Sequence, residues 1–308
     1  MSFKFIDLFA GLGGMRIAFE NCGGTCVFSS DIDKSARCIY KDNFNELPFG
    51  DITLMPPENI PNYDILLGGF PCQPFSTMGN QKGFKDPKSG NLFFTILNIL
   101  KITQPKAFLL ENVKGLLTIE KGAIFKEIYN SLESVGYTVF HKVLNSKHYT
   151  PQKRERVIIV GLRNDLPNKD FQYPIPPPDI YVLQDILETL DENLSARYTM
   201  PESRWYSSIE RNAKRKLEGK SLFPHVIASL TGQTHTLIRS YKNNPTTILI
   251  AQENKLPRYL TPRECARLQG FPESYKITVS DATAYKLFGN SVTVPLIQAV
   301  AENLIKFI

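Results

Sequence analysis

One cysteine of this chain, Cys72, stands where a reactive side chain would be presented. It follows an apolar run at residues 63–67 that is typical of a buried strand, and it lies between Pro71 and Pro74. Sites in α/β proteins are built at the carboxyl ends of strands, and the two prolines fix the local backbone. A lone cysteine is more often an inert buried thiol, so the rest of the chain has to decide between the two interpretations.

Other polar side chains follow other predicted strands. Glu111 comes after residues 107–110, and Asp31 comes after residues 25–30, about twenty residues beyond a glycine-rich turn at 10–14. Glycines let a ligand approach the backbone at a helix N-terminus, and an acidic residue at that distance accepts from ribose hydroxyls. The pattern predicts a nucleotide-like cofactor, with Asp51 as a candidate contact to its adenine. A nicotinamide cofactor and a purely structural turn both stay open at this point.

Asp31, Cys72 and Glu111 can lie in one site only if the strands before them end at the same edge of one sheet. Strand and helix patterns alternate over roughly the first 160 residues, which predicts a doubly wound, mostly parallel sheet of Rossmann-like type. The polar stretch from Gln73 to Asn91 lacks hydrophobic periodicity, and we expect a mobile basic lid there. The predicted strands are 4–9, 25–30, 63–67, 107–110, 137–144 and 156–161, and the predicted helices are 15–21, 36–44, 92–102 and 124–135.

A proline-rich connector at residues 173–178 ends this alternation. Beyond it we expect a second, smaller, irregular β-rich domain with short strands at 228–237 and 246–250, and a helix from Cys265 to Leu268. An apolar helix from Pro295 to Phe307 should return to pack on the first domain. The predicted domains are therefore 1–181 with 286–308, and 182–285.

The positive charge is concentrated in the second part. The chain carries a formal net charge of +6, and residues 204–263 hold eleven lysines and arginines against three glutamates, an excess of eight positive charges. A basic segment beside a near-neutral domain indicates a polyanionic partner, and nucleic acid is the one we expect. The cluster at 211–216 is also consistent with nothing more than a solvated helix face.

Composition excludes several other classes. No apolar run approaches the ~20 residues that span a bilayer, and the first residues lead directly into a predicted strand, so we expect no signal peptide and a cytoplasmic protein. The five cysteines are odd in number and lack paired Cys-x-x-Cys spacing. We therefore expect reduced thiols and no metal site.

Six motifs in a fixed order give the chain a specific resemblance. It resembles the bacterial DNA cytosine-5 methyltransferases of restriction-modification systems, from Phe5 to the closing helix and apart from the basic middle. One departure is that the aromatic position which stacks on adenine in that family is matched by Ile32. The motifs are DLFAGLGG at 7–14, GFPCQ at 69–73, ENV at 111–113, QKRER at 152–156, RLQGFP at 267–272 and GNSV at 289–292.

The resemblance implies catalytic roles that the chemistry explains. A thiolate from Cys72 would add to C6 of cytosine and activate C5. Glu111 would protonate or hydrogen-bond N3, and Arg156 would hold O2. Arg154 would support the loop and a nearby phosphate. The base must first be flipped out of the duplex, because none of these groups reaches C6 inside the stack.

The resemblance also implies S-adenosyl-L-methionine as the cofactor and sequence-specific recognition of double-stranded DNA by the 182–285 domain. A monomer is implied, with a cognate restriction endonuclease as a functional rather than a physical partner. The implied cofactor residues are Phe9, Gly11, Gly13, Asp31, Ile32, Asp51, Ile52, Pro71 and Asn290, and the implied DNA-binding residues are Gln73, Ser76, Lys82, Lys85, Gln152, Arg239 and Lys242.

The motifs around Cys72 and Glu111 exclude a nicotinamide-dependent oxidoreductase. Two alternative functions remain. One is a tRNA cytosine-5 methyltransferase, against which the absence of that group's Cys-Phe-Thr tripeptide and the long basic segment both count. The other is an inactive, methyltransferase-like DNA-binding subunit. Such a subunit should have lost its nucleophile or its acid, whereas Cys72 and Glu111 are both present.

Overall fold

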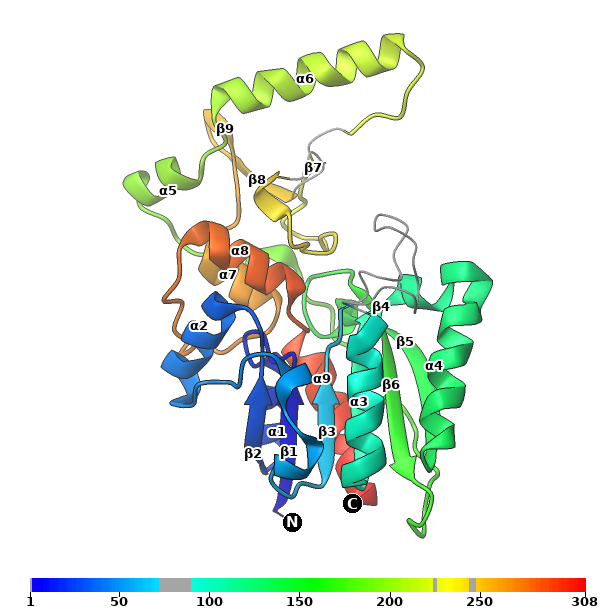
Figure 1. The fold of residues 1–308 in the computed structure, drawn as a ribbon. Coiled ribbons are helices and arrows are strands. Elements are labelled where there is room, and N and C mark those ends of the chain that lie inside the picture. The colour runs from blue at the N-terminus through cyan, green and yellow to red at the C-terminus, as the bar shows by residue number, and fades with distance from the viewer. Residues whose placement is uncertain (1, 72–89, 224–225, 244–247) are drawn as a thin grey trace. The chain divides into compact units, whose positions relative to one another are not determined.

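The computed structural model describes residues 2–71, 90–223, 226–243 and 248–308 (Figure 1). The chain divides into two units, and each is described by itself. The first unit comprises Met1–Asn145, Glu155–Pro176 and Val294–Ile308, and the second comprises Ser146–Arg154 and Pro177–Thr293. The predicted boundaries at 181/182 and 285/286 differ from these by a few residues, and the sequence did not indicate that residues 146–154 group with the second unit.

A six-stranded sheet forms the centre of the first unit. Its strands run in the order β2, β1, β3, β4, β6, β5, and within this sheet β6 runs antiparallel to its neighbours β4 and β5 while β2, β1, β3 and β4 pair in parallel. The prediction of a mostly parallel sheet is confirmed. The bounds are β1 Phe3–Leu8, β2 Gly24–Ser30, β3 Ile65–Gly68, β4 Ala107–Val113, β5 Tyr137–Asn145 and β6 Glu155–Arg163.

Helices cover both faces of this sheet, as the apolar runs in its strands require. Successive strand residues point to opposite faces, and Leu66, Phe108 and Leu110 join one core with the buried sides of α3 (Gly90–Thr103) and α4 (Ala123–Ser134). On the other face Phe5 packs against Phe19 of α1 (Gly14–Glu20), with ring centroids 5.7 Å apart. The closing helix α9 (Val294–Leu304) packs on α1, which confirms that the C-terminal segment returns to the first unit. Helix α2 (Lys34–Phe44) follows β2.

The second unit contains more helix than the sequence predicts. Its three-stranded sheet is small, and residues 228–237, all of them described, form no strand. Their backbone groups instead bond to another segment, as where Leu183 and Gln184 donate to the carbonyls of Gly232 and Leu230. The elements are β7 Val226–Ile227, β8 Ile248–Gln252, β9 Lys255–Arg258, α5 Glu192–Tyr198, α6 Glu202–Leu217, α7 Pro262–Leu268 and α8 Asp281–Asn290.

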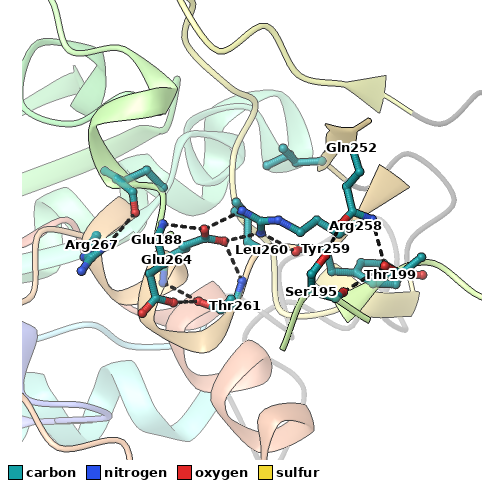
Figure 2. A network of polar contacts seen from close by, with 12 residues as sticks. Glu188, Ser195, Thr199, Gln252, Arg258, Tyr259, Leu260, Thr261, Glu264 and Arg267 are labelled. Atoms are coloured by element: carbon teal, nitrogen blue, oxygen red, sulfur yellow. Dashed lines mark hydrogen bonds and ion pairs between the residues drawn. The ribbon is translucent and has the colours of Figure 1, made fainter. Parts of the chain in front are cut away.

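A buried ion pair lies at the centre of the second unit (Figure 2). The two terminal guanidinium nitrogens of Arg258 donate to the two carboxylate oxygens of Glu264, at 2.8 Å each, and these side chains are 7% and 0% exposed. The same carboxylate accepts from the backbone N–H groups of Glu188 and Thr261, at 2.9 and 2.8 Å. Glu264 therefore joins β9, the start of α7 and the segment that precedes α5.

A second polar cluster lies inside the first unit. The Asp7 side chain is 1% exposed on β1, and among the described residues its Oδ2 atom has no hydrogen-bond partner. Burial raises the pKa of Asp7 well above its usual value, and the positive charge of Arg16 opposes this only in part. Arg16 is itself paired with Glu20 and Glu46, at 2.7 Å each. Asp7 is thus a buried carboxyl group that folding makes harder to ionise.

No helix within the described part of the chain combines the length and the apolar character that a membrane span requires.

We predict that Glu264→Gln lowers the free energy of unfolding by about 3–5 kcal/mol, because it leaves the buried Arg258 charge uncompensated. Glu273→Gln is the matched control. Its carboxylate is 63% exposed and pairs with Arg267 at 2.7 Å, and exposed pairs contribute only about 0–1 kcal/mol. Denaturant unfolding of both variants measures the difference, and equal effects would contradict a central role for the buried pair.

We predict that Asp7→Asn gains stability relative to the parent as the pH rises. The folded-state pKa of Asp7 lies above its unfolded value, so the parent has its full stability below the unfolded pKa and loses stability as the pH increases through the folded pKa. The uncharged amide has no such loss. The difference in unfolding free energy between the variant and the parent should increase by up to about 1.4 kcal/mol per pH unit above roughly pH 4. Urea unfolding of both proteins between pH 4 and pH 8, without cofactor, measures this difference. A difference that decreases as the pH rises would refute the prediction.

Candidate active site

Three loops of the predicted site begin at one edge of the first unit's sheet. Leu8 of β1 pairs with Gly68 of β3, and Gly68 pairs with Leu110 of β4, all in parallel. The turn after β1, the loop after β3 and the end of β4 therefore start side by side. This edge brings together the glycine-rich turn, the approach to Cys72, and Glu111, as the sequence predicts.

The strand register explains how Glu111 meets Arg156. In the antiparallel pair, Glu111 lies opposite Ile158 and Val113 lies opposite Arg156, so Glu111 and Arg156 are diagonal neighbours on one face. The Arg156 Nε atom lies 2.9 Å from Glu111 Oε1, and the side chains are 15% and 12% exposed. The other carboxylate oxygen, Oε2, faces the loop after β3, because a Cβ added to Gly69 would lie 3.7 Å from it. One oxygen is held by a cation while the other faces the segment that leads to Cys72.

Asn112 holds that same loop from β4, a role that the sequence analysis did not assign. Its Nδ2 atom donates to the carbonyl oxygen of Phe70 at 3.0 Å, and the side chain is 3% exposed. Pro71 follows and is half-buried. The amide at the end of a predicted strand, beside Glu111, was the signal that could have indicated this contact.

Cys72 and four predicted DNA-binding residues, Gln73, Ser76, Lys82 and Lys85, lie outside the described residues, as does nearly all of the predicted lid. The four cysteines that are described are free thiols. Burial raises the pKa of Cys22 to about 11, that of Cys26 to about 12, and that of Cys265 well above its usual value. These three are therefore protonated and poor nucleophiles at neutral pH.

The turn after β1 is built on left-handed backbone. Phe9, Gly11 and Gly13 have φ values of 56°, 55° and 74°, which L side chains rarely adopt. The Gly11 N–H donates to Asp31 Oδ2 at 2.8 Å, and the Asp33 N–H donates to Asp31 Oδ1 at 2.7 Å. Asp31 therefore ties the turn to the loop after β2, which places the predicted ribose acceptor directly beside the glycines.

Packing behind the turn explains why Gly13 has no side chain. A Cβ at this position would lie 2.4 Å from the Phe44 ring at the end of α2. The Arg16 guanidinium in turn covers the Phe44 ring, 4.5 Å from its centroid. Phe44 and Arg16 thus support the turn, and sequence analysis missed both. The Glu20 at i+4 from Arg16 was the available signal, since such pairs form on helices.

The remaining predicted cofactor residues of the first unit lie around Asp31. The Asp31 N–H donates to the Phe49 carbonyl at 2.9 Å, which brings the 49–52 segment alongside. Ile32 is 72% exposed and offers an apolar surface. The Asp51 side chain caps residues 52–54 by accepting from Thr53, and Ile52 is 3% exposed. The cofactor contacts of Asp51 and Ile52 stay predictions.

Gln152 was predicted to contact DNA, and the structure contradicts this. Its side chain is 0% exposed. Its Oε1 atom accepts from the Leu237 N–H at 2.7 Å, and its Nε2 atom lies 3.2 Å from Gln269 Oε1 and 3.3 Å from the Leu268 carbonyl oxygen. Gln152 has no surface to offer a phosphate or a base, and it joins segments within the second unit.

Arg154 is likewise 2% exposed, which contradicts the predicted contact to a phosphate. Its guanidinium donates to the carbonyl oxygens of Leu237, Gly289 and Ser291, at 2.8, 3.3 and 2.6 Å. The loop-supporting part of the prediction agrees with these contacts. Arg154 is therefore a positioning residue of the second unit.

Gly289 has a packing role in the GNSV motif. A Cβ there would lie 2.4 Å from the Ile238 carbonyl group and 2.5 Å from the Arg239 nitrogen, so α8 can approach this backbone only at glycine. Asn290 follows as an exposed residue, and its cofactor contact stays a prediction. Arg239 and Lys242 are also exposed, and Lys242 Nζ lies 5.8 Å from the Tyr259 ring centroid. Their DNA contacts stay predictions as well.

Across the residues that the structure describes, no group of histidine, cysteine, aspartate and glutamate side chains is arranged to hold a metal ion.

Comparisons with known proteins agree with this geometry. Residues 3–306 match the sequence model of the C-5 cytosine-specific DNA methylase family. The type II methyltransferase M.DsaV of Dactylococcopsis salina is 44% identical over 306 residues, covering 99% of this chain and 86% of that protein. The type II methyltransferase M.NlaX of Neisseria lactamica is 44% identical over 306 residues, covering 98% and 96%.

Solved structures share the fold. That of the S. pombe Dnmt2 methyltransferase superimposes with a TM-score of 0.80 at 23% identity, covering 99% of this chain and 98% of that one. A putative DNA modification methyltransferase encoded within an E. coli prophage gives 0.72 at 22% identity, covering 99% of each chain. The family model matches almost the whole sequence, and the two relatives are 44% identical to it. The chain therefore belongs to the C-5 cytosine-specific DNA methylase family and is a DNA cytosine-5 methyltransferase.

Proposed function

We propose that this enzyme transfers a methyl group from S-adenosyl-L-methionine to C5 of a cytosine flipped out of double-stranded DNA, within a short specific sequence, through a covalent adduct between Cys72 and C6. The observation that carries the proposal is the Glu111–Arg156 pair, 2.9 Å apart, with the other carboxylate oxygen of Glu111 facing the loop that leads to Cys72. A carboxyl and a guanidinium side by side match the N3 and O2 atoms of one edge of cytosine.

The residues of the first unit fit the cofactor. Asp31 offers carboxylate oxygens beside the left-handed turn at Phe9–Gly13, and Ile32 offers an exposed apolar surface for adenine. The Gly11 N–H fixes the orientation of the Asp31 carboxylate before any ligand arrives. When bound, the cofactor supplies an electrophilic methyl group on a sulfonium. Side chains of the protein supply the nucleophile and stabilise the charge that develops on the base.

Cys72 starts the reaction in this proposal. Its thiolate forms a bond to C6, and the electron pair of the C5–C6 double bond moves through the ring toward N3, which leaves C5 nucleophilic. The bound Phe70 carbonyl anchors the residue two positions before Cys72, so Asn112 acts as a positioning residue for the nucleophile.

Glu111 and Arg156 stabilise the charge that this addition creates. Glu111 holds a proton at N3 through Oε2, and Arg156, which already binds Oε1, donates to O2. Once C5 has gained the methyl group, whose bond to the cofactor sulfur breaks in the transfer, water accepts the C5 proton. The electron pair of the C5–H bond re-forms the C5–C6 double bond, and the S–C6 bond breaks with its electron pair returning to Cys72. The same pair thus serves both the addition and the elimination.

The target base has to leave the helix for these contacts to form. Flipping costs a few kcal/mol, which contacts in the pocket offset. We assign recognition of the flanking sequence to residues of the basic second unit, with Arg239 and Lys242 as exposed candidates for DNA contact.

We predict that Cys72→Ser retains DNA binding but loses methyl transfer by at least about a thousandfold, because a serine hydroxyl is far less ionised than a thiol at neutral pH. Transfer of labelled methyl groups to DNA, with tRNA as a second acceptor, measures this. Cys38→Ser, at an exposed cysteine, is the matched control and should retain activity.

Bisulfite sequencing of a randomised DNA library treated with the parent gives the modified base and the sequence around it. A duplex with 5-fluorocytosine at the site so found should trap the parent covalently, since fluorine cannot leave as a proton does. Near-parental transfer by Cys72→Ser, or binding without trapping, would exclude the proposed mechanism, and methylation of tRNA alone would exclude the DNA substrate.

We predict that Asp31→Ala weakens cofactor binding by about 1.5–3 kcal/mol, roughly 10- to 150-fold, which is the scale of charged hydrogen bonds. Asp33→Ala removes the same charge two residues away, from the side chain that caps α2 through Ser35 and Ala36. That control should lose about 1 kcal/mol of stability and keep its cofactor affinity. Calorimetry with S-adenosyl-L-methionine decides, and equal affinities for the two variants would count against Asp31 as the ribose acceptor.

A further inference from the structure

The longest helix of the second unit is anchored at its N-terminal end. Helix α6 spans sixteen residues, of which Ser208 is the one buried. Just before the helix, the Met200 N–H donates to the Pro257 carbonyl of β9 at 2.9 Å, and the Arg204 guanidinium lies 5.9 Å from the Tyr259 ring centroid. From this anchor beside β9 the helix extends outward (Figure 1). Most side chains of its C-terminal half are exposed.

The segment after α6 folds back on the helix and is held there. The Asn212 side chain donates to the Phe223 carbonyl at 3.0 Å and accepts from the Phe223 N–H at 2.8 Å. The Arg215 Nε donates to the Ser221 carbonyl at 2.6 Å, and its guanidinium lies 4.7 Å from the Phe223 ring centroid. Residues 202–223, which we name the α6 arm, therefore have a defined shape before any ligand binds, which lowers the cost of binding.

Three cations of the arm are not used by the fold. Arg211, Lys214 and Lys216 are exposed, and within the described ranges none of them forms an ion pair. By contrast, Arg215 is engaged with Phe223, and Lys220 pairs with Glu218 at 2.9 Å. Cations in the last turn stabilise a helix through its dipole, but Arg211 lies before that turn, so the dipole does not account for it.

We propose that the α6 arm binds the phosphates of double-stranded DNA outside the base-reading contacts, and so contributes affinity without selecting sequence. The inference rests on the proposed function. Arg211 and Lys214 are three residues apart and share one helix face with Ser207, which is also exposed. Guanidinium, ammonium and hydroxyl groups are the donors that proteins use for phosphate oxygens.

Helix α6 also carries exposed apolar side chains, including Tyr206, Ile209 and Leu217, which are 54%, 49% and 90% exposed. A second copy of the chain docked on these apolar side chains is the competing explanation for an exposed helix. The charge favours DNA, because residues 204–263 hold eleven basic against three acidic side chains and the substrate proposed for this enzyme is a polyanion.

The test compares two triple variants with the same change in charge. Arg211→Gln/Lys214→Gln/Lys216→Gln removes the free cations of the arm, and Lys101→Gln/Lys121→Gln/Lys126→Gln removes three exposed lysines of the first unit. Binding to a non-cognate duplex is measured between 50 and 200 mM salt. The log–log slope of the arm variant should be less steep than that of the parent by about 2, because Arg211 and Lys214 share one helix face and each cation that binds a phosphate adds about 0.9 to the slope.

Further measurements separate the possible failures. Bisulfite sequencing should give the same methylated sequence for the arm variant and the parent, and Arg211→Lys/Lys214→Arg/Lys216→Arg should restore the salt slope. Equal slopes for the two triple variants, or a changed methylated sequence, would overturn the inference. A third result would also overturn the inference: the parent forms a dimer that Leu217→Ser abolishes, and the arm variant binds DNA as the parent does. A parent that methylates no DNA would instead refute the proposed function itself.

Discussion

The antiparallel pairing of β6 with β4 is the constraint on which the candidate active site depends. It sets Val113 opposite Arg156, so that Arg156 reaches Glu111 diagonally across one face of the sheet. A slip of one residue would send one of the two side chains to the opposite face. Residues 107–110 of β4 and 157–162 of β6 are apolar and buried, and this burial fixes the register. The hydrophobic core of the first unit therefore determines the geometry of its most polar pair.

The same logic applies to the glycine-rich turn. Its left-handed backbone costs free energy that the surroundings must offset, and the stack of Gly13, Phe44 and Arg16 together with the Gly11–Asp31 hydrogen bond supplies contacts that hold it. The site thus has rigid walls on two sides, from β4 with Asn112 and from α2 with Phe44. Such preorganisation is what charge stabilisation in a reaction requires.

Motif residues of the second unit have a different purpose. Gln152, Arg154 and Gly289 are buried and hold backbone segments at close approach, and the Arg258–Glu264 pair does the same for β9 and α7. Their function is to give shape to a unit with only a small sheet. The side chains available to a nucleic acid are instead exposed ones, such as Arg239, Lys242 and the free cations of the α6 arm.

The sequence by itself determined the order of strands and helices in the first unit, its mostly parallel sheet, and the family, because periodic apolar runs and short motifs are local properties of a chain. Asp31 and Glu111 could be identified as strand-end residues for the same reason. Only the tertiary structure decided that Gln152 and Arg154 are buried, that Phe44 and Asn112 support the site, and that residues 202–223 form a helical arm with free cations. Burial and pairing depend on which distant segments meet, as where Arg154 binds carbonyls 83 to 137 residues away. A local pattern of residue types does not contain that information.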